Sequence, residues 1–206
     1  MNITLTVCLT FTGEDFMPTL EPYTLDFFKI VNRDETAQAK ALQKGMIERF
    51  HPKSVIDFGC ATGLYLTEFE CKKLGVDLTE DAFNDEVRKI DRELLKTADL
   101  TKIQDFDQYD LGLCIEVLEH IPEEFTDQVI ENMVNCSDCW VVTAAPPGQT
   151  GTNHVNCQPQ GYWEEKFWRQ GFQRDYVEET WLVWSQAGVP CQLWLIRNLM
   201  VFKKVG

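Results

Sequence analysis

Basic residues are scarce in this chain of 206 residues, in which 19 lysines and arginines stand against 33 aspartates and glutamates. The formal net charge is therefore −14, and the basic residues are scattered rather than grouped in one stretch. An acidic surface repels phosphate backbones, and proteins that bind nucleic acids normally have the opposite charge balance. The composition argues against nucleic acid as a partner and favours a small molecule.

Features of export and of membrane insertion are also missing. The first 28 residues contain no lysine or arginine, so the basic region that opens a signal peptide is absent. No apolar run approaches the ~20 residues of a membrane span. The eight cysteines are spread through the chain without the spacing of a disulfide framework, which is typical of reduced thiols. We therefore expect a cytoplasmic protein that does not insert into a membrane.

Internal repeats are absent too, so the sequence does not indicate a repeat protein. A chain of this length can bury about 70% of its unfolded surface as one α/β domain. Residues 3–11 (ITLTVCLTF) alternate strictly between apolar and polar, which predicts a half-buried strand. That strand is expected either to cover a sheet edge or to form a homodimer with a second subunit. We expect residues 1–41 to form an N-terminal strand and helical cover, and residues 42–206 to form the main domain.

Residues 55–63 (VIDFGCATG) are an apolar run that meets an acid and then breaks into small residues. This pattern predicts a buried parallel strand that turns tightly into a helix. A P-loop would need lysine and serine or threonine after Gly63, and the dinucleotide fingerprint G-x-G-x-x-G would need glycine at Ala61. The remaining pattern has an acid two residues before the first glycine and glycines at both ends of the turn, as Asp57, Gly59 and Gly63 supply.

This pattern resembles the first motif of the class I S-adenosylmethionine (SAM) dependent methyltransferases, acid-x-Gly-x-Gly-x-Gly, and the resemblance extends over residues 42–204. It implies an enzyme with SAM as its cofactor. It also implies an α/β, Rossmann-like class I methyltransferase fold, with a seven-stranded, mostly parallel sheet, helices on both faces and an antiparallel last strand. Ala61 departs from the motif, so we expect either a negative φ there or a turn that lies further from the ligand.

The periodicity of apolar residues and the length of each apolar run predict further helices and strands along the chain. Residues 25–50 are predicted to be helical, in two pieces broken near residue 33. Val177, Trp181 and Trp184 recur at helical spacing and are expected to pack in the core or a lid rather than to form a substrate platform. Further helices are expected over residues 64–71, 79–92, 125–136 and 163–170, and further strands over 73–77, 94–100, 109–120, 140–145, 172–176 and 193–203.

Polar side chains follow several of these strands, at the sheet edge where open parallel sheets bind ligands. The resemblance implies that Asp77 accepts hydrogen bonds from both ribose hydroxyls, that Leu78 lies against the adenine and that Asp99 lies near the adenine amino group. A solvated loop acid is the alternative for Asp99, and a side chain that bonds the loop backbone is the alternative for Glu116. The predicted cofactor site comprises Asp57, Gly59, Ala61, Gly63, Asp77, Leu78, Asp99, Leu100 and Glu116.

Residues 146–163 (PPGQTGTNHVNCQPQGYW) form a loop rich in glycine, proline and amides, directly after a predicted strand. Loops of this composition on a rigid scaffold usually carry function. A base is needed if the acceptor is a hydroxyl or a protonated amine, and imidazole titrates near neutrality. His154 is the first candidate for the catalytic base and His120 the second. The further groups that the loop offers to a polar acceptor are Asn156, Gln158, Tyr162 and Trp163.

Glu116, Glu119 and His120 have the spacing E-x-x-E-H, which resembles the metal-binding motif of small-RNA 2'-O-methyltransferases. In that resemblance a later histidine completes the site, and His154 is the candidate. Carboxylate and imidazole ligands suit manganese, zinc or iron better than magnesium. The same letters occur in many metal-free members of the larger family, and the chain is acidic, so we expect no metal.

These observations together predict an enzyme that transfers a methyl group from SAM to a small polar acceptor, a sugar or metabolite, by in-line displacement at an oxygen or nitrogen. Two alternatives stay open. One is a metal-dependent RNA 2'-O-methyltransferase, and the other is a non-catalytic SAM-binding protein.

Overall fold

The computed structural model describes residues 23–189 and 193–206. The predicted strand at residues 3–11, and the homodimer contact assigned to it, lie outside the described residues. Within the described segments, no helix combines the length and the apolar character that crossing a membrane requires.

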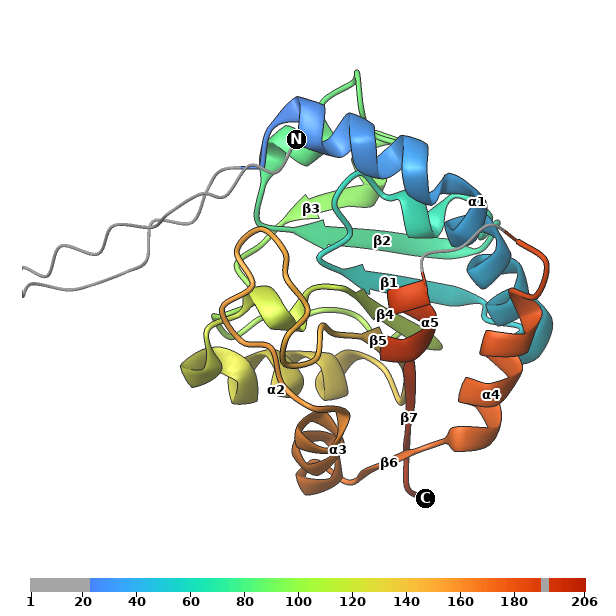
Figure 1. The fold of residues 1–206 in the computed structure, drawn as a ribbon, viewed down its shortest axis with the longest axis vertical. Coiled ribbons are helices and arrows are strands. Elements are labelled where there is room, and N and C mark those ends of the chain that lie inside the picture. The colour runs from blue at the N-terminus through green and yellow to red at the C-terminus, as the bar shows by residue number, and fades with distance from the viewer. Residues whose placement is uncertain (1–22, 190–192) are drawn as a thin grey trace, which may run out of the picture.

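A seven-stranded sheet forms the centre of the molecule (Figure 1). Its strands lie in the order β3-β2-β1-β4-β5-β7-β6. Strands β1 to β5 all run parallel to one another. Strand β7 runs antiparallel to both of its neighbours, β5 and β6. The predicted fold class, including the antiparallel last strand, is therefore confirmed. The strands are β1 (Ser54–Phe58), β2 (Lys72–Asp77), β3 (Leu95–Thr97), β4 (Leu111–Ile115), β5 (Cys139–Thr143), β6 (Phe172–Arg174) and β7 (Met200–Lys204).

Helices cover both faces of the sheet (Figure 1). Successive strand residues point to opposite faces, so Val55 of β1 belongs to one buried cluster and Ile56 to the other. Helices α1 (Leu25–Phe50), α4 (Tyr176–Ser185) and α5 (Leu193–Asn198) contribute to the Val55 cluster, and α2 (Thr126–Cys136) and α3 (Gln160–Arg169) contribute to the Ile56 cluster.

Helix α1 is one continuous helix of 26 residues, so the predicted break near residue 33 is wrong. Thr24 caps its first turn, and His51 ends it with φ of 46°. Asn32 does not interrupt the helix because its side chain bonds other elements: its amide donates to the Val87 carbonyl and its Oδ1 accepts from the Thr62 hydroxyl. The division proposed at residue 41 falls inside α1 and stays a prediction.

Two predicted helices are each reduced to a single 3-10 turn. The helix expected at 64–71 is present only at Leu64–Leu66, and the one expected at 79–92 only at Glu80–Phe83. Asn84 ends the second turn with an extended backbone, and its side chain accepts the backbone amide two residues on. Such local side-chain bonds compete with helix formation.

The strand predicted at 193–203 is wrong in its first half, because the structure has α5 followed by β7 there. A short apolar run does not by itself distinguish a buried helix from a buried strand. Only the five residues of β7 pair with the sheet, between β5 and β6.

Val177, Trp181 and Trp184 of α4 are exposed, so their expected packing in the core is wrong, and their alternative role in a lid stays a prediction. Val177 is 69% exposed, Trp181 44% and Trp184 76%. Leu182 of α4 is fully buried in the core, and Val183 packs against it. The Arg49 guanidinium lies over the ring of Trp181, 5.5 Å from its centroid.

Candidate functional site

Three neighbouring strands place acids at one edge of the sheet. Asp57 lies near the end of β1, Asp77 ends β2, and Glu116 directly follows β4. Because β2, β1 and β4 are adjacent and parallel, these carboxyl groups come to the same edge. This is the edge at which open parallel sheets bind ligands.

The glycine turn has a left-handed backbone at three positions, with φ of 71° at Gly59, 45° at Ala61 and 77° at Gly63. A negative φ at Ala61, one of the two alternatives expected from its methyl group, is therefore wrong. The first and last glycines are also required by space. A side chain at Gly59 would meet Val117 at 2.3 Å, and one at Gly63 would meet Ile90 at 2.7 Å.

Asp77 joins this turn to the end of β2. Its Oδ2 accepts from the Ala61 amide at 2.8 Å, and its Oδ1 accepts from the Thr79 amide at 2.9 Å. Burial raises the pKa of Asp77, while the bonds from the backbone amides lower it. Each oxygen keeps a second lone pair, so the carboxylate can accept further bonds from a ligand. Leu78, the predicted adenine contact, is 65% exposed beside it.

Asp57 is 2% exposed, and its Oδ2 has no hydrogen-bond partner among the described residues. Burial raises the pKa of this carboxyl group well above its usual range, and the charge of Asp77 raises it further. A buried polar atom without a partner is costly, so the arrangement favours a ligand that supplies one.

Asp99 and Leu100 serve the local structure of the loop after β3. Oδ1 of Asp99 accepts from the amide and the hydroxyl of Thr101 at 2.9 and 2.6 Å. Leu100 is 7% exposed and packs in the core. Their predicted contact with the adenine stays a prediction.

Glu116 has φ of 52°, an uncommon backbone conformation for a glutamate. Its Oε1 accepts from the Asn198 amide at 3.1 Å and its Oε2 from the Gln149 amide at 3.2 Å. The Asn198 amide also donates to Oε1 of Gln149 at 3.1 Å, which closes a ring of three side chains. Sequence reasoning missed Gln149 and Asn198, because each depends on a contact between distant parts of the chain.

Both candidate base histidines lie beside this edge, and backbone carbonyls hold them. Nδ1 of His120 lies 3.2 Å from the Asn153 carbonyl and 3.1 Å from the Tyr23 hydroxyl, and Nδ1 of His154 lies 3.2 Å from the Gln149 carbonyl. A carbonyl only accepts, so Nδ1 is the donor in each ring, and in the neutral form of each ring the lone pair is on Nε2. Burial lowers the pKa of His120 to about 4.

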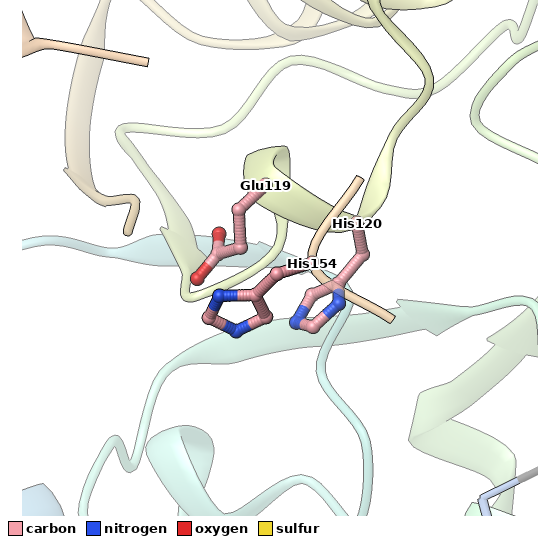
Figure 2. A group of neighbouring side chains, drawn as sticks. All are labelled: Glu119, His120 and His154. Atoms are coloured by element: carbon pink, nitrogen blue, oxygen red, sulfur yellow. The ribbon is translucent and has the colours of Figure 1, made fainter. Parts of the chain in front are cut away.

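Glu119 is fully buried between the β4 loop and the long loop, and its carboxyl oxygens have no hydrogen-bond partner within the part of the chain that the structure describes. Burial raises its pKa to about 9, and the charge of Glu116 contributes. Figure 2 shows this carboxyl group beside the rings of His120 and His154. One ligand atom from each of these three residues lies within 4.8 Å of the others.

Other residues of the long loop hold the fold rather than line the site. Trp163 is fully buried in the core. Asn156 is 3% exposed and donates to the Thr126 hydroxyl, and Gln158 donates to Oδ1 of Asn156. Tyr162 reaches the exposed Glu123. Of the loop residues singled out from the sequence, His154 is therefore the one that the structure brings beside Glu119 and His120.

No family model and no curated protein matches the chain. Several solved structures do match the chain in fold. The sugar N-methyltransferase KedS8 from Streptoalloteichus sp ATCC 53650 has a TM-score of 0.66 and 14% identity, with 98% of this chain and 100% of that chain covered. Magnesium protoporphyrin IX methyltransferase (ChlM) from Synechocystis PCC 6803 has a TM-score of 0.60 and 16% identity, with 86% of each chain covered.

The small RNA methyltransferase HEN1 is also similar, with a TM-score of 0.57 and 14% identity over 96% of this chain but only 27% of that chain. At these identities the similarity establishes the fold. The chain has the Rossmann-like fold of class I SAM-dependent methyltransferases.

Proposed function

We propose that the protein is a SAM-dependent methyltransferase that acts on a small polar acceptor, a sugar or metabolite, at an oxygen or nitrogen. The observation that carries this proposal is the bond from the Ala61 amide to Asp77, which joins the left-handed glycine turn to the acid at the end of β2. The similarity in fold to methyltransferases of small molecules supports it.

The residues of the edge fit SAM as a ligand. Asp77 keeps acceptor capacity for ribose hydroxyls, and Leu78 offers an exposed apolar surface to a ring. Asp57 has an unpartnered oxygen, and SAM carries positive charge. When bound, SAM supplies a methyl group that is already activated on a sulfonium, for in-line displacement.

The protein's contribution is then mainly alignment, which alone can supply roughly 7 to 11 kcal/mol of the barrier. His154 is proposed as the base that takes a proton from the acceptor, with His120 as the second candidate. In the neutral form of each ring Nε2 is the basic nitrogen, because Nδ1 donates to a backbone carbonyl.

The test is a thermal-shift comparison of SAM, S-adenosylhomocysteine, NAD and ATP, followed by transfer of labelled methyl groups to a panel of acceptors. The proposal expects stabilisation by the first two compounds and not by NAD or ATP. Stabilisation by NAD alone would contradict it. Tight SAM binding without transfer to any acceptor would favour the non-catalytic alternative.

A second candidate function is metal-assisted methylation of an RNA 2'-hydroxyl, and one observation favours it. One ligand atom each of Glu119, His120 and His154 lies within 4.8 Å of the others, and the Glu119 carboxyl group is fully buried. A carboxylate and two imidazoles at this distance would hold manganese, zinc or iron, and such an ion would polarise an acceptor hydroxyl. The chain corresponds to only 27% of the RNA methyltransferase that it resembles, and its net charge of −14 opposes RNA binding.

Metal binding and the metal dependence of activity separate the small-molecule methyltransferase from the metal-dependent RNA methyltransferase. The purified protein, dialysed against a chelator, would be titrated with manganese and zinc by calorimetry, in wild type and in Glu119→Gln. Stoichiometric binding that Glu119→Gln abolishes, with activity that requires the metal, would select the second candidate. Activity that survives chelation would select the first.

A further inference from the structure

Helix α4 has apolar residues on two of its sides, and the described residues cover only one of them. On the inner side, Leu182 is fully buried in the core. On the outer side, Val177, Trp181 and Trp184 recur at helical spacing and are exposed. A helix that is apolar all round is normally buried. The outer side of α4 is therefore a surface that another molecule can cover.

Charged residues are missing from this outer side. The side of a surface helix that faces solvent is normally charged or polar, and α2 follows this rule with Asp127 and Glu131 exposed. The exposed residues of α4, by contrast, are all uncharged. We call them the α4 face, which consists of Tyr176, Val177, Thr180, Trp181 and Trp184.

The acids of α4 and of its N-terminal cap are neutralised within the chain. Carboxyl oxygens of Asp175 and Glu178 lie 3.2 and 2.9 Å from Nζ of Lys203. An oxygen of Glu179 lies 2.8 Å from the Arg174 guanidinium. The whole chain has a net charge of −14, so two copies repel each other in most orientations. At the α4 face, two copies can meet without that repulsion.

The area of the α4 face suits a dimer. An aromatic side chain removes roughly 150 to 250 Å² from water when it is buried. The large apolar residues of the α4 face are 44% to 76% exposed, so the face presents on the order of 400 Å² of mainly apolar surface. A stable interface buries about 800 Å² on each partner, of which roughly 60% is apolar. The α4 face therefore supplies most of the apolar area that one partner of a stable dimer needs.

The position of α4 keeps this surface away from the predicted ligand site. In Figure 1, strands β1 and β2 point toward one side of the molecule and α4 lies on the other, beside the end of α1. A bond between Arg49 of α1 and Glu178 of α4 holds the helix there. A partner bound to the α4 face therefore does not cover the edge that carries Asp77 and His154.

We propose that the α4 face is a homodimer interface, in which two copies of the chain pack α4 against α4 across a two-fold axis. In such an interface the same surface of each copy meets itself, so it must be complementary to itself. An uncharged aromatic face meets this condition, and tyrosine and tryptophan are enriched at interface centres. Nucleic acids and anionic membranes are bound through basic residues, which the α4 face lacks.

This interface is distinct from the contact expected at residues 3–11, and it does not depend on the proposed function. The test is sedimentation velocity of the full chain over about 1 to 100 µM, since interfaces of standard size bind at micromolar Kd or tighter. We expect a dimer whose Kd falls within or below this range. A wild-type protein that is monomeric throughout the range would overturn the proposal.

Variants locate the interface. Trp184→Glu places a like charge from each copy at the interface and should raise the dimer Kd by roughly 100-fold or more. Val177→Glu should do the same, and its acid in the first turn of α4 favours the helix, so the fold is retained. Ile103→Glu is the matched control, because Ile103 is 83% exposed on the loop that α2 holds through Gln104 and Asn132. The control should leave the Kd within about twofold.

A dimer that both Trp184→Glu and Val177→Glu leave intact would place the contact elsewhere, for example at residues 3–11, and would overturn the proposal. Two further outcomes would assign the α4 face to another occupant and overturn it as well. One is a monomer that binds vesicles of neutral lipid and loses this binding in Trp184→Glu. The other is a monomer in which α4 is protected from hydrogen exchange and loses that protection in Val177→Glu.

Discussion

The amide of Ala61 donates to Oδ2 of Asp77 at 2.8 Å, so an alanine with left-handed backbone and an acid 16 residues later hold each other in place. The cost of positive φ at an alanine is of order 1 kcal/mol, and this bond to a charged group is of the size that offsets it. The departure from glycine at Ala61 is therefore accommodated without displacing the turn from β2.

Replacing Asp77 by alanine should weaken SAM binding by ~1.5 to 3 kcal/mol, or roughly 10- to 150-fold, because the proposed ribose contacts would be lost. The Ala61 and Thr79 amides also lose their acceptor, so the melting temperature without ligand should fall. Calorimetry with SAM and a thermal scan measure the two effects. Asp81→Ala, at an exposed position after β2, is the control and should change neither. Unchanged SAM affinity in Asp77→Ala would remove Asp77 from the site.

Gly63→Ala should destabilise the protein by about 1 to 3 kcal/mol and weaken SAM binding, because the new methyl group meets Ile90 at 2.7 Å and φ is 77°. Gly161→Ala is the matched control. A side chain there meets nothing within 4 Å, and alanine is the better helix former, so this variant should be neutral or slightly more stable. Urea unfolding compares the two. Equal stability of the two variants would contradict the strain assigned to the turn.

His154→Ala should lower turnover by roughly 10² to 10⁴ while SAM binding stays near the wild-type value. The reason is that the proposed cofactor residues belong to other elements, whereas His154 lies beside His120 with ring centroids 4.9 Å apart. Steady-state kinetics and calorimetry on the same preparation provide the comparison. A similar loss in Glu119→Gln, together with sensitivity to a chelator, would instead support a metal at this point.

Glu35 should make the stability of the ligand-free protein depend on pH in a defined window. Burial raises its pKa to about 7 in the folded protein from 4.5 when unperturbed, so the folded state holds the extra proton between these values. Its contribution to stability is therefore fully present below pH 4.5 and is lost as the pH rises to 7. Relative to wild type, Glu35→Gln should gain stability over that window. Thermal scans at half-unit steps measure this, and parallel curves for the two proteins would contradict it.

Asn198→Asp should destabilise the protein at neutral pH by about 1 to 3 kcal/mol, because it places a second carboxylate 3.1 Å from Oε1 of Glu116. The loss should diminish at pH 5, where a shared proton relieves the repulsion. Asn135→Asp, at an exposed position of α2, is the control. Urea unfolding at the two pH values measures the difference, and a pH-independent loss would indicate a packing defect instead.

Most of the parallel strands could be predicted from the sequence because they are short apolar runs that end in an acid or a turn. The pattern from Asp57 to Gly63 indicated the sheet edge at which a ligand is expected. The length of the helix after β2 could not be predicted, because Asn84 bonds the backbone locally and ends the turn. The ring of Glu116, Gln149 and Asn198 joins residues up to 82 positions apart, and no local pattern predicts such a contact. His120 and His154 had been grouped only through the resemblance to the small-RNA methyltransferases, and in the structure their ring centroids lie 4.9 Å apart.

The continuity of α1 has a mechanical consequence. At ~1.5 Å per residue its 26 residues form a rod of about 39 Å. Near one end Tyr23 touches His120 and Thr152, and near the other Arg49 is bonded to Glu178 of α4. Because one unbroken helix joins these two sets of contacts, a change at the Arg49 end can be transmitted through the backbone to Tyr23. Removing the Arg49 side chain tests this connection without altering a residue beside the histidines.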